Sequence, residues 1–379
     1  MGQINGYDRE IPGLDTLPWG HIFGGKGITM LQFSDALRQH GELWDLYTRK
    51  EEYSPRRLDQ YGCFPFADSS YQEILTPVVS QYLKDNGFEI KYPDNRKFAV
   101  CLTHDVDDIY PPLKHTLLST LACLKQRNFG GLRKQIFWKL HGKEKSPYWN
   151  FTEIMDLEER YGARSSFYFL ATDSDVSRFR YNIEDLENEL GQIIDKGWEV
   201  GLHGGYYAYD DLEKILVEKK RLEHVLGRKV TGYRNHYLRF QVPDSWEYLA
   251  QAGFGYDTTL GYNETVGFKN GMCYPFRPYN LHTDREVSLL EIPLTIMDST
   301  LFEMVSSYDE AWELVKQLVD TVASCQGVLT LNWHSNSFNC PYKAHWPRMY
   351  EEILKYCQTK NAWLTNGSEL ITWWKKISY

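Results

Sequence analysis

Apolar and polar positions divide the chain into two parts near residue 95. From about residue 97 to the C-terminus, short apolar runs alternate with segments whose apolar residues recur at helical spacing. Seven or eight such strand–helix units in succession predict a closed or nearly closed barrel of parallel strands. The expected strands lie at 98–102, 165–170, 198–203, 230–234, 254–257, 289–297, 327–334 and 362–365.

The first 95 residues follow a different pattern. Gly, Pro and short aromatic clusters break residues 1–29 into turns, and helical periodicity appears in only two short segments after them. We therefore expect a small accessory domain over residues 1–95 and the α/β barrel over residues 96–379. The polar segment 91–97 is the expected junction between them.

Residues 111–147 interrupt the barrel pattern directly after its first strand. Their apolar residues recur at helical spacing in two segments, which predicts a helix–loop–helix insertion. Lys and Arg lie between the apolar positions and give the insertion a net positive charge in an acidic protein. This charge could attract an anionic substrate or partner, and the alternative is an ordinary solvated helix face.

Composition restricts the compartment and the partners. The chain has 379 residues, of which 42% are hydrophobic, and no apolar run approaches the length of a membrane span. The N-terminus lacks the basic and apolar regions of a signal peptide, and the seven cysteines form no CxxC pair. We therefore expect a cytoplasmic protein with reduced cysteines. The net charge of −9 disfavours nucleic acid as a partner.

Charged and metal-binding side chains gather at the C-terminal ends of the expected strands. A parallel barrel brings these ends together at one rim, where catalytic groups collect. An acidic residue after a strand can also cap the next helix, and a single histidine can be an ordinary core residue. The recurrence of such residues at successive strand ends favours a catalytic or metal site. They are Asp105, Asp107, His203, Arg234, His236, Asp257, Asp298 and His334.

The order and context of these residues resemble the polysaccharide deacetylase family, carbohydrate esterase family four, over roughly residues 97–375. The resemblance implies a distorted parallel (β/α) barrel of about seven strands and a metal-dependent hydrolase that removes acetyl groups from sugars. Residues 45–68 also resemble the N-terminal module found beside this kind of barrel. The five family motifs are matched, in order, by 103–107 (THDVD), 199–207 (EVGLHGGYY), 232–239 (GYRNHYLR), 256–262 (YDTTLGY) and 331–334 (LNWH).

The resemblance also implies roles for individual residues. It assigns Asp105 as the general base, His334 as the general acid, and Arg234 as the group that keeps Asp105 ionised and oriented. It assigns Asp107 and His203 as ligands of a divalent ion, zinc first, with cobalt, nickel or manganese as alternatives. Substrate contacts are expected from Tyr206, Asp257, Tyr262 and Trp333.

The second motif departs from the family pattern. The family has two histidines four positions apart, whereas this chain has His203 and then Tyr207. Two ligands are too few, because a catalytic zinc-type site has three protein ligands and one open position. His236, at the end of the adjacent strand, is the expected third ligand. His104 is an alternative, although it alternates with Asp105 and should face the other side of its strand. A degenerate site without metal is the third possibility.

These observations predict a hydrolase acting on carbon–nitrogen bonds other than peptide bonds, with an N-acetylated sugar or glycan precursor as substrate. A non-hydrolytic carbohydrate-binding relative and an amidase for a non-sugar amide are the alternatives. Aromatic residues make up 15% of the chain, which suits a sugar-binding cleft as well as core packing. The pattern carries no signal for the oligomeric state.

Overall fold

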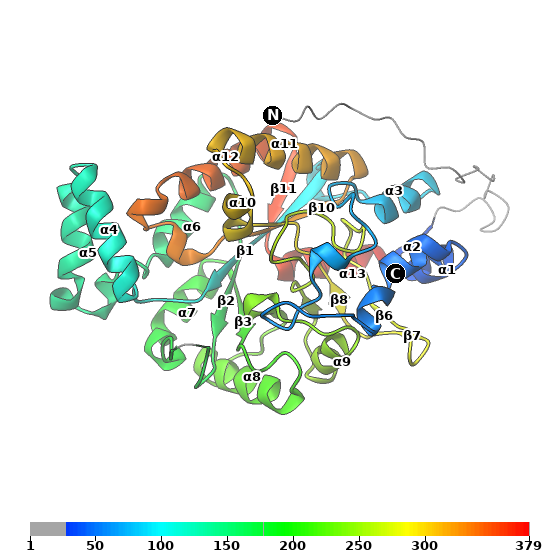
Figure 1. The fold of residues 1–379 in the computed structure, drawn as a ribbon, viewed down its shortest axis with the longest axis horizontal. Helices are drawn as coiled ribbons and strands as arrows, with labels where there is room; N and C mark the ends of the chain where they lie inside the picture. The colour runs from blue at the N-terminus through cyan, green and yellow to red at the C-terminus, as the bar shows by residue number, and fades with distance from the viewer. Residues whose placement is uncertain (1–27, 177, 379) are drawn as a thin grey trace.

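A sheet of nine strands forms the centre of the structure, a computed structural model that describes residues 28–176 and 178–378. Eight strands follow one another in the order β8-β5-β4-β3-β2-β1-β10-β9, β11 also pairs with β1, and all these pairs are parallel. The sheet curls into a half-barrel (Figure 1), which confirms the predicted distorted (β/α) barrel. The strands are β1 (Phe98–Val106), β2 (Ser166–Leu170), β3 (Glu199–Gly204), β4 (Gly232–Asn235), β5 (Tyr256–Asp257), β8 (Leu290–Glu291), β9 (Ile296–Met297), β10 (Val328–Asn332) and β11 (Ala362–Thr365).

β1 is the central strand, and all nine of its residues are buried. β11 pairs with residues 98–101 of β1, β2 pairs with residues 103–106, and β10 pairs with residues 99–103. The C-terminal end of β1 therefore lies between β2 and β10. Because successive strand residues point to opposite faces, Asp105 faces the barrel interior while His104 contacts Glu158 in the outer layer.

Helices cover the outside of the barrel (Figure 1). In α11, buried apolar residues recur at helical spacing from Ala311 to Val322, which gives the helix one face for the sheet. α8 begins after Asp211, whose side chain accepts a hydrogen bond from the backbone N–H of Lys214, and ends at Gly227 with φ 69°. The helices of this layer are α6 (Phe151–Glu159), α7 (Glu187–Asp195), α8 (Leu212–Leu226), α9 (Asp244–Gln251), α10 (Asp298–Met304), α11 (Tyr308–Cys325), α12 (His345–Thr359) and α13 (Gly367–Ser378).

The segment before β1 packs against the barrel and shares its hydrophobic core. Phe88 contacts Tyr274 with ring centroids 4.9 Å apart, and the buried Arg49 donates to the carbonyl oxygen of Lys269 at 2.7 Å. The N-terminal accessory domain stays a prediction, and its first 27 residues lie outside the described range. The short helices of this segment are α1 (Phe33–Leu37), α2 (Gly41–Tyr47) and α3 (Val78–Asp85); an antiparallel ribbon of β6 (Tyr279–Asn280) and β7 (Arg285–Glu286) lies outside the main sheet.

The insertion after β1 is a helical hairpin of α4 (Leu113–Lys125) and α5 (Phe129–His141), as predicted for residues 111–147. It projects from one end of the barrel (Figure 1). α5 begins after Asn128, whose side chain accepts a hydrogen bond from the backbone N–H of Gly131 at 2.8 Å. In the described part of the chain, no helix is long and apolar enough to cross a membrane.

The strand predicted at 289–297 is instead two short strands, β8 and β9, which lie at opposite edges of the sheet. Pro293 stands between them and has no N–H to donate to a ladder. Backbone hydrogen bonds hold this connection at both ends, including those from the N–H of Ile292 to the carbonyl oxygen of Asp257 and from the N–H of Thr295 to the carbonyl oxygen of Thr330. The segment therefore bridges the open side of the half-barrel without forming a continuous strand.

Candidate active site

Three side chains in or directly after β1, β3 and β4 meet at the C-terminal rim of the barrel. Asp107 follows β1, His203 lies in β3, and His236 follows β4 in a short 3₁₀ turn, His236–Leu238. The Nε2 atoms of His203 and His236 lie 3.2 Å and 3.5 Å from Oδ1 of Asp107. One ligand atom from each residue lies within 4.8 Å of the others. The structure thus brings together the three residues expected to bind the metal.

His236 reaches this cluster through a turn rather than through strand alternation. β4 ends at Asn235, and the two residues after His236, Tyr237 and Leu238, have φ of 60° and 50°. Left-handed backbone is uncommon for residues with a side chain and costs on the order of 1 kcal/mol or more. The chain therefore leaves the sheet abruptly here. The turn places the imidazole of His236 beside that of His203, with ring centroids 5.0 Å apart.

Each histidine of the cluster is oriented by a contact at its other ring nitrogen. Nδ1 of His203 lies 2.9 Å from the carbonyl oxygen of Arg234, and Nδ1 of His236 lies 3.2 Å from Oδ1 of Asp175. If both Nδ1 atoms carry the proton, both Nε2 atoms present lone pairs towards Asp107. A ligating histidine is commonly fixed by such a contact, which sets its tautomer and its ring orientation.

Asp175 was not found by sequence reasoning. It lies in the loop after β2, which has no periodic pattern, and its side chain is only 1% exposed. Arg180 donates from Nε to Asp175 at 2.6 Å and also pairs with Asp108 at 3.4 Å. Burial raises the pKa of Asp175, but the contacts with His236 and Arg180 outweigh burial and hold the pKa below its usual value. Arg180 therefore ties the loop to the end of β1.

Asp105 lies beside the metal cluster on the interior face of β1. Its Oδ2 accepts a hydrogen bond from Asn332 at 2.7 Å and lies 3.8 Å from Nε2 of His203. The guanidinium of Arg234 is fully buried, with Nε 3.4 Å from Oδ1 of Asp105, and it donates to Thr103 at 2.7 Å. Arg234 and Asn332 therefore each lie next to one of the two carboxylate oxygens of Asp105.

His334 faces the cluster from the opposite side, after β10. Its Nδ1 lies 2.5 Å from Oδ1 of Asp298, and its Nε2 lies 3.7 Å from Oδ2 of Asp107. Burial lowers the pKa of His334, but the ion pair and hydrogen bond with Asp298 outweigh burial and raise the pKa to about 10. Ser337 donates to Asp298 at 2.8 Å and helps to hold it. The imidazole can thus present an N–H to the site.

His104 is excluded from the cluster by its contacts. Its Nδ1 lies 2.7 Å from the carbonyl oxygen of Trp333, and its Nε2 lies 2.8 Å from Glu158 in α6. Both ring nitrogens therefore have partners on the outer face of β1, as strand alternation predicted. Tyr207, which stands at the position of the missing histidine, is 46% exposed and contacts the ring of Tyr206.

Three of the four expected substrate contacts lie in the packed interior. Asp257 is fully buried and accepts a hydrogen bond from Thr259 at 2.6 Å, Trp333 is fully buried in the core, and Tyr262 accepts a hydrogen bond from Arg49 at 3.0 Å. Tertiary packing covers these three side chains in the structure. Tyr206 alone is partly exposed, and its ring lies under the guanidinium of Arg239.

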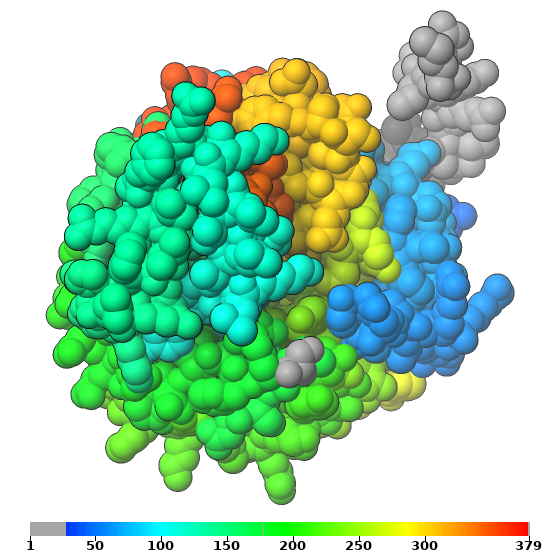
Figure 2. Space-filling model, turned by 60° about the vertical axis from the view of Figure 1, so that its left-hand side comes forward, coloured from blue at the N-terminus to red at the C-terminus, as the bar shows by residue number. Residues whose placement is uncertain are grey.

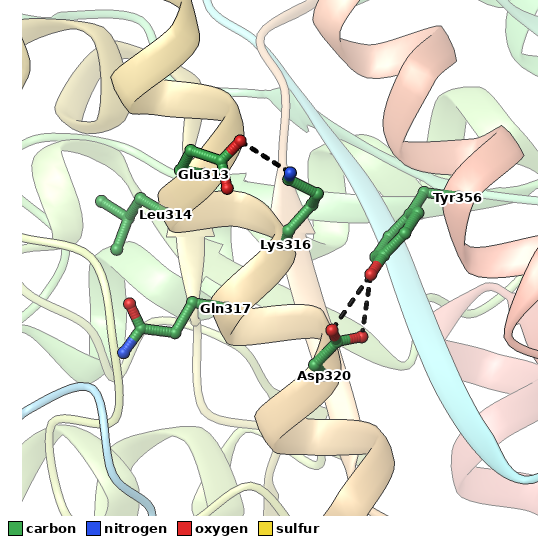
Figure 3. A pocket seen from close by; sticks show the side chains of 6 residues that line it. All are labelled: Glu313, Leu314, Lys316, Gln317, Asp320 and Tyr356. Atoms are coloured by element: carbon green, nitrogen blue, oxygen red, sulfur yellow. Dashed lines mark hydrogen bonds and ion pairs between the residues drawn. The ribbon is translucent and has the colours of Figure 1, made fainter.

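A pocket on the outer helical layer contains none of this chemistry. It lies along α11 and α12, where Glu313 pairs with Lys316 and Tyr356 donates to Asp320 (Figure 3). These side chains form ordinary surface ion pairs, which contribute little to stability or binding. The chemistry of the protein is therefore concentrated at the rim.

Comparison with protein-family models found no match, and comparison with curated proteins found none either. Solved structures do match. A Mycobacterium smegmatis protein assigned to the polysaccharide deacetylases matches at 19% identity and a TM-score of 0.51, covering 76% of this chain and 93% of its own. The chain has the polysaccharide deacetylase fold. A Pseudomonas aeruginosa PAO1 protein, also assigned to the polysaccharide deacetylases, matches at 14% identity and a TM-score of 0.51, over 85% of this chain and 98% of its own.

A solved structure named for a different activity matches as well. The structure of Puue allantoinase matches at 15% identity and a TM-score of 0.52, covering 85% of this chain and 98% of its own. At identities of this size, the structural match shows the shared fold alone. The chemistry of this chain has to be argued from its own rim residues.

Proposed function

We propose that this protein is a metal-dependent hydrolase that removes an acetyl group from an N-acetylated sugar or glycan precursor. The observation that carries the proposal is the convergence of Asp107, His203 and His236 at the rim, within 4.8 Å of one another. Asp105 and His334 flank this cluster at 3.8 Å and 3.7 Å, each with its own buried charged partner. A cytoplasmic location and a carbohydrate substrate belong to the same proposal.

The donor set fits a divalent ion. One carboxylate oxygen and two imidazole nitrogens are the ligands of many catalytic zinc sites, in which the fourth position stays open. Zinc is our first candidate, and cobalt, nickel and manganese are alternatives, because imidazole and carboxylate ligands suit all four. Such an ion, when bound, lowers the pKa of a coordinated water to about 7 and polarises a carbonyl group.

The flanking residues supply the proton transfers. Asp105 accepts a proton from the attacking water, while Arg234 and Asn332 orient its carboxylate. As the carbonyl carbon gains the water oxygen and loses the amine nitrogen, His334 donates a proton from Nε2 to that nitrogen. Asp298 holds the imidazole in position for this step. The products are acetate and the free amine.

An amidase for a non-sugar amide is the second candidate. The observation that favours it is the burial of Tyr262 and Trp333, which were expected to contact a sugar. The same base, acid and metal ligands would cleave a small cyclic or linear amide. Substrate preference separates the two candidates, since a deacetylase turns over an N-acetylglucosamine oligosaccharide and an amidase turns over a cyclic ureide.

The experiment combines metal analysis with two variants of the purified protein. We expect one equivalent of a divalent ion in the wild type and none in Asp107→Ala, with the fold unchanged by circular dichroism. Asp105→Asn should keep the ion and lose about 10²–10⁴-fold in kcat. Asp156→Asn, an exposed position in α6, is the matched control and should behave as wild type. Full turnover by Asp105→Asn, or a wild type without metal, would refute the proposal.

A further inference from the structure

The helical hairpin of α4 and α5 exposes an unusual number of large apolar side chains. Seventeen large apolar residues are exposed in the described part of the chain, and nine of them belong to this hairpin. Soluble proteins seldom expose a contiguous apolar surface without using it for binding. The nine are Leu113, Leu117, Leu118, Leu121, Leu124, Phe129, Ile136, Phe137 and Leu140, with exposed fractions from 37% to 81%.

The hairpin is amphipathic with the apolar side outwards. Leu113, Leu117, Leu121 and Leu124 follow one another at helical spacing and form a single stripe on α4. The α4 residues that are buried are Ser119 and Cys123, and α5 buries Gln135 together with Trp138. A helix that only covers a protein core has the reverse arrangement. The exposed stripe is therefore not explained by packing within this chain.

The hairpin is also strongly basic in an acidic protein. Between residues 113 and 145 there are eight Lys or Arg and one Glu, whereas the whole chain has a net charge of −9. All eight basic residues are exposed. Among the described residues, only Lys134 and Lys143 of these eight form ion pairs, with Glu153 and Asp185. The surface thus combines apolar area with a mostly uncompensated positive charge.

We propose that this hairpin docks on the surface of an anionic lipid membrane. Lys and Arg beside an exposed apolar stripe are typical of helices that lie in the membrane interface, where the stripe enters the acyl boundary and the cations meet anionic headgroups. A second copy of this chain fits poorly, because its hairpin would bring the same positive charge. Each helix has 13 residues, about 20 Å of length, which suits lying on a bilayer rather than crossing it.

The hairpin stands next to the candidate active site. α4 begins shortly after Asp107, and Gln126 at its end donates to the carbonyl oxygen of Pro341, in the chain that follows His334. In Figure 2 the hairpin stands forward of the rest of the barrel. Docking would therefore hold the rim close to the headgroups. This inference does not rest on the proposed reaction, and Asp107→Ala should bind membranes as the wild type does.

Co-sedimentation of the full chain with lipid vesicles tests the inference. The vesicles consist of phosphatidylcholine alone or of an equimolar mixture of phosphatidylcholine and phosphatidylglycerol. We expect binding to the mixed vesicles, at least about tenfold weaker binding to phosphatidylcholine alone, and weaker binding to the mixed vesicles as salt rises, because salt screens the charge of the anionic headgroups. These three measurements need no variant.

Two triple variants distinguish binding through the hairpin from non-specific binding through other exposed apolar residues. Leu117→Gln, Leu121→Gln and Leu140→Gln together should weaken binding to mixed vesicles at least about tenfold. The control combines Leu58→Gln, Leu216→Gln and Val217→Gln, which are exposed apolar residues outside the hairpin, and should leave binding unchanged. Should the hairpin variant fail to fold, Leu140→Gln alone, at a position 78% exposed, should give about a threefold loss.

Three results would overturn the inference. The first is no binding to mixed vesicles at low salt. The second is equal loss of binding in the hairpin variant and in the control variant. The third is a wild-type dimer in solution that the hairpin variant converts to a monomer, since this result would assign the apolar face to contact between copies.

Discussion

The rim of the barrel and the α4–α5 hairpin both depart from the usual burial pattern of a soluble protein. The rim buries charged side chains, whereas the hairpin exposes large apolar ones. At the rim, charged groups are buried: Arg234 is fully enclosed and Asp105 is 3% exposed. In the hairpin, Leu113 and Leu140 are 81% and 78% exposed. Burying a charge and exposing a large apolar surface both cost free energy, so each usually marks a function.

The two regions differ in whether the partners of these side chains lie inside the protein. The buried charges of the rim are matched inside the protein, because Asp105 meets Arg234 and His334 meets Asp298. The exposed leucines of the hairpin have no comparable cover within the described part of the chain. The rim is therefore organised before any ligand arrives, whereas the hairpin needs a partner from outside. The substitutions below test this difference, beginning with the largest expected effect.

His236→Ala tests whether the rim is organised around a metal. Removing the third ligand should lower divalent-ion affinity by roughly 10–100-fold or more, measured by titration calorimetry. Tyr207→Phe is the control, because Tyr207 is 46% exposed and lies at the position of the missing family histidine. Its affinity should equal that of the wild type. Normal binding in His236→Ala, or lost binding in Tyr207→Phe, would contradict the ligand assignment.

The sequence predicted the location of His236 at the rim but not the backbone turn that positions it. Apolar runs and charged strand ends located the rim correctly, since strand periodicity and parallel order depend on local pattern. His236 was expected at the end of its strand. It reaches the cluster through a turn with left-handed backbone at Tyr237 and Leu238, residues whose type gives no sign of such a turn.

The sequence pattern did not predict the role or burial of residues that depends on tertiary packing. Asp175 and Arg180 lie in an irregular loop, so no periodic pattern indicates that they support His236. Tyr262 and Trp333 were expected to contact the substrate because they lie in segments that resemble family motifs. An aromatic side chain suits a cleft and a core equally well, and only the folded chain shows that both are buried.

Asp175→Ala tests whether the support of His236 matters. Losing the carboxylate at Nδ1 should lower metal affinity about tenfold, less than the loss in His236→Ala, because the ligand remains but its orientation is freed. Asp175→Asn should recover part of the affinity, since an amide oxygen can still accept the hydrogen bond. Asp173→Asn, at an 89% exposed position in the same loop, should change nothing. Equal affinity in Asp175→Ala and wild type would show that Asp175 has no positioning role.

Asp257→Asn tests the cost of burying charge beneath the rim. Burial raises the pKa of Asp257 to about 6, and it lies beside Glu291, which is also fully buried. Between about pH 4 and pH 6 the unfolded chain loses this proton while the folded chain keeps it, so the free energy of unfolding falls as pH rises. Over this pH range the free energy of unfolding, measured in urea, should fall by on the order of 2 kcal/mol less in the variant than in the wild type. Parallel pH profiles for variant and wild type would contradict this account, and Asp156→Asn is the control.

Leu117→Gln should have the smallest effect, and it tests whether an exposed leucine of the hairpin contributes to the free energy of unfolding. Leu117 is 61% exposed, so its replacement should change the free energy of unfolding by no more than about 0.5 kcal/mol in the absence of lipid. Leu102→Ala, at a fully buried position in β1, should cost about 2–5 kcal/mol in the same urea titration. If Leu117→Gln instead cost more than about 2 kcal/mol, the leucine stripe would be packed in the free protein, and the hairpin would need no external partner.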